Sequence, residues 1–175
     1  MRKLERLSEI MIVLASVFLR LVPHPPNVTP IGALAVFGGR SFPSIWGALG
    51  VTLAALLLSD LVLGFYPYAP YVYGAFALSV LIGAASRRWK GATPVAIAGL
   101  ASSVVFFVVT NLGFWWSGGF YPRTQVGLVE CFVAALPFFR NAVLGDLAFL
   151  ALIYGARFAA QRLIDAQSAV RRSVP

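Results

Sequence analysis

The sequence predicts an all-α integral membrane protein, a single domain of six transmembrane helices. Of its 175 residues, 59% are hydrophobic and only 11% are charged, and the mean hydropathy is +0.84. Soluble domains carry roughly 25% charged residues, so this composition excludes an ordinary soluble fold. Several separate apolar runs exclude a single anchor. The chain length accommodates about six spans of roughly 20 residues each.

The first two predicted spans are joined by a rigid break. The first covers residues 8–22, and Arg20 lies in its last turn, where a long basic side chain can reach the membrane surface. Residues 23–30 (PHPPNVTP) hold four prolines, each of which lacks a backbone donor and disfavours helix in the preceding residue. Thr29 suits the N-cap of a second span over residues 29–39. Because this segment is too short to cross alone, we expect it to be tilted or partly buried.

The middle of the chain predicts three further spans. The clearest is residues 44–64, which contains Asp60. Residues 65–73 (FYPYAPYVY) form an aromatic and proline-rich corner typical of membrane–water interfaces, although its four tyrosines also suit stacking on a ligand. The fourth span covers residues 72–85 and the fifth residues 93–111.

The last third of the chain predicts a long connection and the sixth span. Trp115 and Trp116 precede a Ser-Gly-Gly sequence, in which glycine allows the backbone to move, so the connection is expected to act as a lid over a pocket. Simple anchoring at the interface is the alternative. A helix over residues 126–136 follows, Pro137 breaks or kinks it, and the sixth span covers residues 138–159.

The distribution of basic residues predicts the orientation. With six crossings and a cytoplasmic N-terminus, both termini and nearly all basic residues fall on the cytoplasmic side, as the positive-inside pattern requires. The opposite loops hold only His24 and Arg123. The same pattern accounts for the net charge of +8, so we expect no nucleic-acid partner. The basic residues assigned to the cytoplasmic side are Arg2, Lys3, Arg6, Arg40, Arg87, Arg88, Lys90 and the C-terminal arginines.

This topology gathers the remaining polar residues in the outer half of the membrane. An ionisable group in hydrocarbon costs about 2.5–3.5 kcal/mol on insertion scales and usually faces a bundle interior or a wet cavity. We therefore expect an outward polar pocket in which Arg140 pairs with Asp60 or Asp146. A purely structural network that fixes helix packing is the alternative. The residues predicted to bind a solute are Asn27, Asp60, Asn111, Trp115, Trp116, Tyr121, Arg123, Arg140, Asn141 and Asp146.

Catalytic, cofactor and metal sites are not expected. His24 is the only histidine, so a two-histidine metal site is excluded. Cys131 is the only cysteine, which excludes an internal disulfide and a multi-cysteine metal site. The chain has no phosphate-binding glycine-rich loop, so it encodes no ATPase of its own.

Four segments carry a resemblance to known proteins: PHPPNVTPIGALAVFGG, LLLSDLVLGF, VTNLGFWWSGGFYPRT and PFFRNAVLGD. Together they resemble a family of small bacterial membrane proteins described as candidate transport proteins of unknown function. That family is similar, more distantly, to the substrate-binding S components of energy-coupling-factor vitamin transporters. The resemblance implies an S-component-like bundle in the bacterial inner membrane, a small-molecule site open to the outside, and a partner scaffold with ATPases. The first span lacks the Ala-xxx-Ala motif by which S components dock, so a solitary transporter stays an alternative.

Two functions follow as hypotheses. The first is uptake of a small, vitamin-like solute through a pocket built from the third, fifth and sixth spans and the two outer connections. The second is an accessory or assembly subunit of a larger membrane complex, in which the polar network only fixes the fold. An enzyme is disfavoured because no nucleophile–base set is present.

Overall fold

The computed structural model describes the backbone of residue 11 and residues 14–173, and side chains as far as residue 166. All regular structure in that part of the chain is helical. The predicted first span lies partly outside the described residues, and residues 14–21 within it are helical. The elements that follow are α2 (Ile31–Ser41), α3 (Ile45–Leu63), α4 (Ala69–Ala85), the 3-10 turn η1 (Ser86–Arg88), α5 (Ala92–Ser117) and α6 (Gln125–Ser173).

Four helices in the described part are long and apolar enough to cross a membrane, as in a multi-pass membrane protein. They are Ile45–Leu63, Ala69–Arg88, Ala92–Ser117 and Gln125–Ala166. The predicted count of six spans is therefore not confirmed. α2 has 11 residues, which correspond to about 16 Å of helix, whereas the hydrocarbon core is about 30 Å thick.

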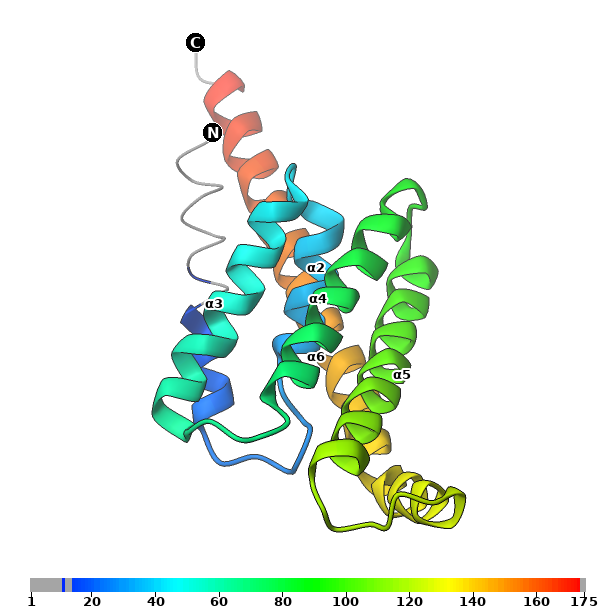
Figure 1. Cartoon of the computed structure of the whole chain (residues 1–175). Helices are drawn as coiled ribbons and strands as arrows, with labels where there is room; N and C mark the ends of the chain where they lie inside the picture. The colour runs from blue at the N-terminus through cyan, green and yellow to red at the C-terminus, as the bar shows by residue number, and fades with distance from the viewer. Residues whose placement is uncertain (1–10, 12–13, 174–175) are drawn as a thin grey trace.

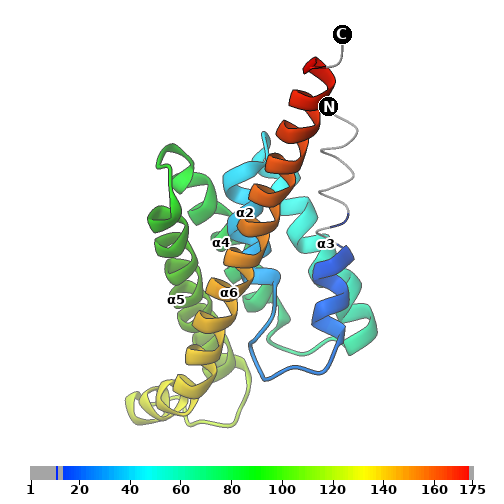
Figure 2. The same ribbon diagram turned by 180° about the vertical axis from the view of Figure 1, so that it is seen from behind.

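The short helix α2 lies at the centre of the bundle and contacts α3, α4, α5 and α6 (Figures 1 and 2). Nine of its residues are buried, from Ile31 to Gly39. Its glycines allow close packing on α4, because a Cβ atom on Gly39 would lie 2.1 Å from the carbonyl oxygen of Val80. A Cβ atom on Gly83 would lie 2.4 Å from the carbonyl oxygen of Val36. Small residues at such crossings let helix backbones approach in membranes.

The connections separate into two ends of the bundle. Residues 22–30, 64–68 and 118–124 lie at one end, and residues 42–44 and 89–91 lie at the other (Figures 1 and 2). Arg40, Arg87, Arg88 and Lys90 lie at the second end, and two of them donate hydrogen bonds to backbone carbonyl oxygens there. Arg40 donates to the carbonyl oxygens of Ser86 and Trp89 at 2.6 and 2.8 Å, and Arg87 donates to that of Gly39 at 2.5 Å.

The predicted helix 126–136 and the predicted span 138–159 form one helix, α6, which continues through Pro137. The ribbon changes direction between its yellow and orange parts, so the proline bends the helix without ending it (Figure 2). Neighbouring helices and local adjustments commonly satisfy the backbone groups that a proline frees in a membrane helix.

α5 extends to Ser117, six residues beyond the predicted end of the fifth span at Asn111. No proline stands between Asn111 and the glycine pair that follows Ser117, where Gly119 adopts a φ of 69°, and Gly113 is buried within the helix. Trp115 and Trp116 therefore belong to the last turn of the helix, whereas the mobile lid was predicted to include them.

Candidate functional site

A cavity of about 430 Å³ lies at the end of the bundle that holds the connections 22–30, 64–68 and 118–124. Its volume falls within the roughly 300–1,000 Å³ range of small-molecule pockets. The lining comes from residues far apart in the sequence: Arg20 on helix 14–21, all three of those connections, and helices α4, α5 and α6.

Aromatic rings form much of the cavity wall. Tyr66 and Tyr68 lie with ring centroids 4.7 Å apart, and Tyr68 meets Phe114 edge-on at 5.2 Å. Deeper in the bundle, Phe76 of α4 and Phe106 of α5 form a tilted pair at 4.9 Å. Two of the four tyrosines of the corner 65–73 thus line the cavity, and whether they stack on a ligand stays a prediction.

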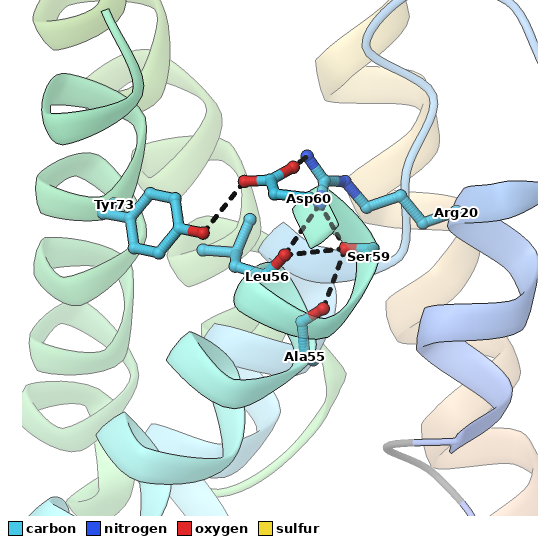
Figure 3. A network of polar contacts seen from close by, with 6 residues as sticks. All are labelled: Arg20, Ala55, Leu56, Ser59, Asp60 and Tyr73. Carbon is cyan, nitrogen blue, oxygen red and sulfur yellow. Dashed lines mark hydrogen bonds and ion pairs between the residues drawn. The ribbon is translucent and has the colours of Figure 1, made fainter. Parts of the chain in front are cut away.

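A buried ion pair adjoins the same wall, with its basic member, Arg20, in the lining. The guanidinium of Arg20 contacts the carboxylate of Asp60 at 2.7 Å, with side-chain exposures of 11% and 0% (Figure 3). Tyr73 approaches from the opposite side, and its hydroxyl donates to Asp60 at 2.9 Å. Arg20 also donates to the carbonyl oxygen of Leu56 at 3.3 Å and to the hydroxyl of Ser59. The pair therefore ties helix 14–21 to α3 and α4.

The predicted pairing of Arg140 with Asp60 or Asp146 is wrong. Arg140 is exposed, and no ion pair joins it to either acid in the part of the chain that the structure describes. Six residues of helix turn the side chain through about 240°, so Arg140 and Asp146 leave α6 in different directions. The basic partner of Asp60 is Arg20, which turns into the bundle, whereas its position in the last turn of a span suggested a side chain at the membrane surface.

Asp146 is the second buried carboxylate and lines the cavity, with only 7% of the residue exposed. The hydroxyl of Ser103 donates to it at 2.7 Å, and the backbone amide of Ala33 donates to it as well. Gly32 is equally close, because a Cβ atom there would lie 2.1 Å from a carboxylate oxygen. The N-cap of α2, Pro30, offers no side-chain acceptor, so Asp146 caps this helix from across the bundle.

Of the other predicted site residues, three line the cavity: Asn27, Asn111 and Tyr121. Asn27 has a positive φ of 63°, and Asn111 donates to a carbonyl oxygen one turn earlier in α5 at 2.7 Å. Asn141 does not line the cavity. It donates to the carbonyl oxygen of Pro26 at 3.1 Å and so holds the connection 22–30 in place.

Trp115, Trp116 and Arg123 do not line the cavity either, and instead fasten the connection 118–124 to the end of α5. The indole of Trp115 donates to the carbonyl oxygen of Pro122 at 3.0 Å. Arg123 donates to the carbonyl oxygen of Trp116 at 2.8 Å and lies 5.0 Å above its ring. Aromatic contacts from this connection to the cavity come from Tyr121 instead.

Sequence reasoning did not assign Arg20, Tyr66 and Tyr68 to the site. Tyr66 lies between α3 and α4, where burial, and next the Asp60 carboxylate, raise the pKa of its phenol. Its hydroxyl therefore stays protonated, and a neutral phenol can donate a hydrogen bond into the cavity. The signal that could have found these residues is that Arg20 and Asp60 each lie in the last turn of a helix that ends on the same side of the bundle. The two tyrosines follow directly after α3.

No cluster of three or more histidine, cysteine, aspartate or glutamate side chains suitable for a metal ion occurs among the described residues.

The chain matches one family model over residues 3–168, which is nearly its whole length. The chain belongs to DUF6580, a family of unknown function. No curated protein and no solved structure matches it. The description of DUF6580 names no activity, substrate or partner.

Proposed function

We propose that this member of DUF6580 binds a small, vitamin-like solute within the membrane and takes part in its uptake. The observation that carries the proposal is the cavity of about 430 Å³, bounded by three connections and lined by both aromatic rings and polar side chains. Such mixed lining is typical of small-molecule sites, where apolar walls supply binding energy and a few polar groups fix orientation.

The proposed membrane is the bacterial inner membrane, with the cavity end facing outward and both termini in the cytoplasm. This orientation is supported by Arg40, Arg87, Arg88 and Lys90, which lie at the end of the bundle opposite the cavity. Uptake against a gradient requires an energy source, and the chain carries no phosphate-binding loop. A coupling scaffold and ATPases encoded elsewhere are therefore the proposed partners, with a solitary transporter as the alternative.

Cysteine labelling tests the orientation. In a Cys131→Ser background, a membrane-impermeant maleimide added outside intact cells should label Gly118→Cys and not Trp89→Cys. Position 118 lies in the connections at the cavity end, and position 89 lies at the basic end. Both should react after the membrane is permeabilised. Labelling of position 89 alone in intact cells would reverse the orientation and contradict an outward site.

A second candidate function, a non-transporting subunit of a membrane complex, is favoured by one feature of the outer surface. An apolar groove of about 400 Å³ runs between α3, α4 and α5, with Gly74 and Ala77 among its lining residues. Small residues of this kind allow close approach of another transmembrane helix. In this case the cavity would stay empty, and the chain would purify with a protein partner.

Filling the cavity separates the two candidates. Ala135 of α6 lines the cavity and is 6% exposed, so Ala135→Trp should occupy the space that a solute needs. Ala151→Trp, at an exposed position of the same helix, is the matched control. Mass spectrometry of extracts from gently purified protein should detect a small molecule with wild type and Ala151→Trp, at a level at least about tenfold lower with Ala135→Trp. A small-molecule content equal in all three proteins would contradict solute binding in this cavity.

A further inference from the structure

The contacts of each charged side chain around the cavity show how far its charge is offset by a neighbour. Arg20 is the only basic residue among the described residues that line the cavity, and its guanidinium is held by Asp60 at 2.7 Å, by Ser59 and by the carbonyl oxygen of Leu56. Asp60 in turn accepts from Tyr73. The positive charge of Arg20 is therefore offset by Asp60, and its guanidinium also forms a hydrogen bond with the side chain of Tyr66.

Asp146 has no such counter-charge. Within the described part of the chain it forms no ion pair, and its hydrogen-bond donors, the hydroxyl of Ser103 and the amide of Ala33, are both neutral. The N-terminus of α2 adds roughly half a positive charge, which offsets the carboxylate only in part. A carboxylate offers about four acceptor sites, so two donors leave acceptor capacity for a third group. An ionised Asp146 therefore lacks a counter-charge among the described residues of the cavity, and a bound cation would supply one.

The rings of the wall act in the same direction. Tyr66, Tyr68 and Phe114 form a continuous aromatic surface, and Phe76 with Phe106 extends it toward the bundle interior. The faces of aromatic rings attract cations, and the attraction is strongest where water is excluded. An anionic solute would meet these ring faces and a carboxylate, while the one basic side chain in the described part of the lining, Arg20, is already paired with Asp60.

We infer that the solute of this cavity is an organic cation, a protonated amine attached to an apolar or aromatic body. Its ammonium group bonds to the carboxylate of Asp146, and its body packs against the rings of the 64–68 connection, α4 and α5. This inference rests on the proposed solute-binding function and adds the chemical class of the solute. Asp146 would then have two roles that can be tested separately. Capping of α2 needs only an acceptor oxygen, whereas binding of the cation needs a negative charge.

Three probes of one shape test the charge. Phenethylamine is a cation at neutral pH, phenethyl alcohol is neutral and phenylacetate is an anion, and all three carry the same ring. Binding to the full chain in phosphatidylcholine nanodiscs is measured by isothermal titration calorimetry. We expect phenethylamine to bind at least about tenfold more tightly than the other two, which corresponds to about 1.4 kcal/mol. Equal or tighter binding of phenethyl alcohol or phenylacetate to wild type would overturn the assignment without any variant.

Two variants then place the site. Asp146→Asn keeps an acceptor oxygen for Ala33 and should weaken phenethylamine at least about tenfold while leaving phenethyl alcohol unchanged. Unaltered amine binding by a folded Asp146→Asn protein would overturn the inference.

Ala135→Trp distinguishes a wrong solute class from the absence of solute binding in the cavity. If phenylacetate or phenethyl alcohol binds best and Ala135→Trp abolishes that binding, the cavity is a solute site and the proposed class is wrong. If no probe binds wild type, or Ala135→Trp affects none of them, both this inference and solute binding in the cavity are contradicted.

Discussion

Asp60→Asn is expected to be among the most damaging single substitutions in this protein. It leaves the guanidinium of Arg20 buried and without its counter-charge, and breaking one partner of a buried ion pair typically costs about 3–5 kcal/mol. Thermal unfolding in detergent should therefore show a large fall in midpoint. Glu130→Gln, at an exposed position of α6, is the matched control and should change the midpoint little.

A double substitution identifies the partner of Asp60. Arg20→Gln combined with Asp60→Asn removes both charges, so part of the lost stability should return. Arg140→Gln combined with Asp60→Asn should give no recovery, because Arg140 is exposed and forms no ion pair with Asp60. Strictly additive losses for Arg20→Gln and Asp60→Asn would show that the two side chains do not stabilise each other.

Gly32→Ala should have an effect of similar size at the other carboxylate. The added Cβ atom would lie 2.1 Å from an oxygen of Asp146, so the carboxylate must move away from Ser103 and Ala33. Overpacking costs about 1–3 kcal/mol, and each hydrogen bond lost to a charged group costs about 1.5–3 kcal/mol. With overpacking and the loss of one of these two hydrogen bonds, we expect a total loss of about 2.5–6 kcal/mol, measured by thermal unfolding.

The control for Gly32→Ala is Gly50→Ala in α3, where a Cβ atom would meet nothing within 4 Å. Alanine favours helix over glycine by about 1 kcal/mol, so this variant should be neutral or slightly more stable. Combining Gly32→Ala with Asp146→Ala removes the side chain with which the new methyl collides, so the double loss should be smaller than the sum. A Gly32→Ala protein as stable as Gly50→Ala would contradict the capping of α2 by Asp146.

The sequence predicted the class of protein and the end of the bundle at which polar residues gather, because hydropathy and the placement of charges carry that information. Asn27, Asn111, Tyr121 and Asp146 were predicted as site residues and line the cavity. Whether they bind a solute stays a prediction. The aromatic corner 65–73 was recognised, but membrane anchoring and ligand contact predict the same residue types there.

The partners of buried charges could not be predicted in the same way. Pairing depends on how each helix is rotated about its axis, and a helix that is apolar on all sides carries no moment to fix that rotation. Arg140 was predicted as the partner because the topology placed it in the same half of the membrane as both acids, and Arg20 was assigned to the membrane surface. Arg140 instead leaves α6 on the exposed side. The pairing of Arg20 with Asp60 brings helix 14–21 and the end of α3 to one wall of the cavity. Tyr66 and Tyr68, which come directly after α3, line the cavity for this reason.

The position of α2 has a consequence for biosynthesis. This helix is 11 residues long, and the partners of its two ends, Asp146 and Arg87, are synthesised after it. When α2 leaves the ribosome, its terminal amides and carbonyls have none of these partners, and unsatisfied backbone groups are costly in lipid. We expect residues 22–41 to remain at the membrane surface or in the insertion machinery until α4 and α6 have entered the bilayer. Insertion of this chain would then be completed out of sequence order, with its central helix among the last to be enclosed.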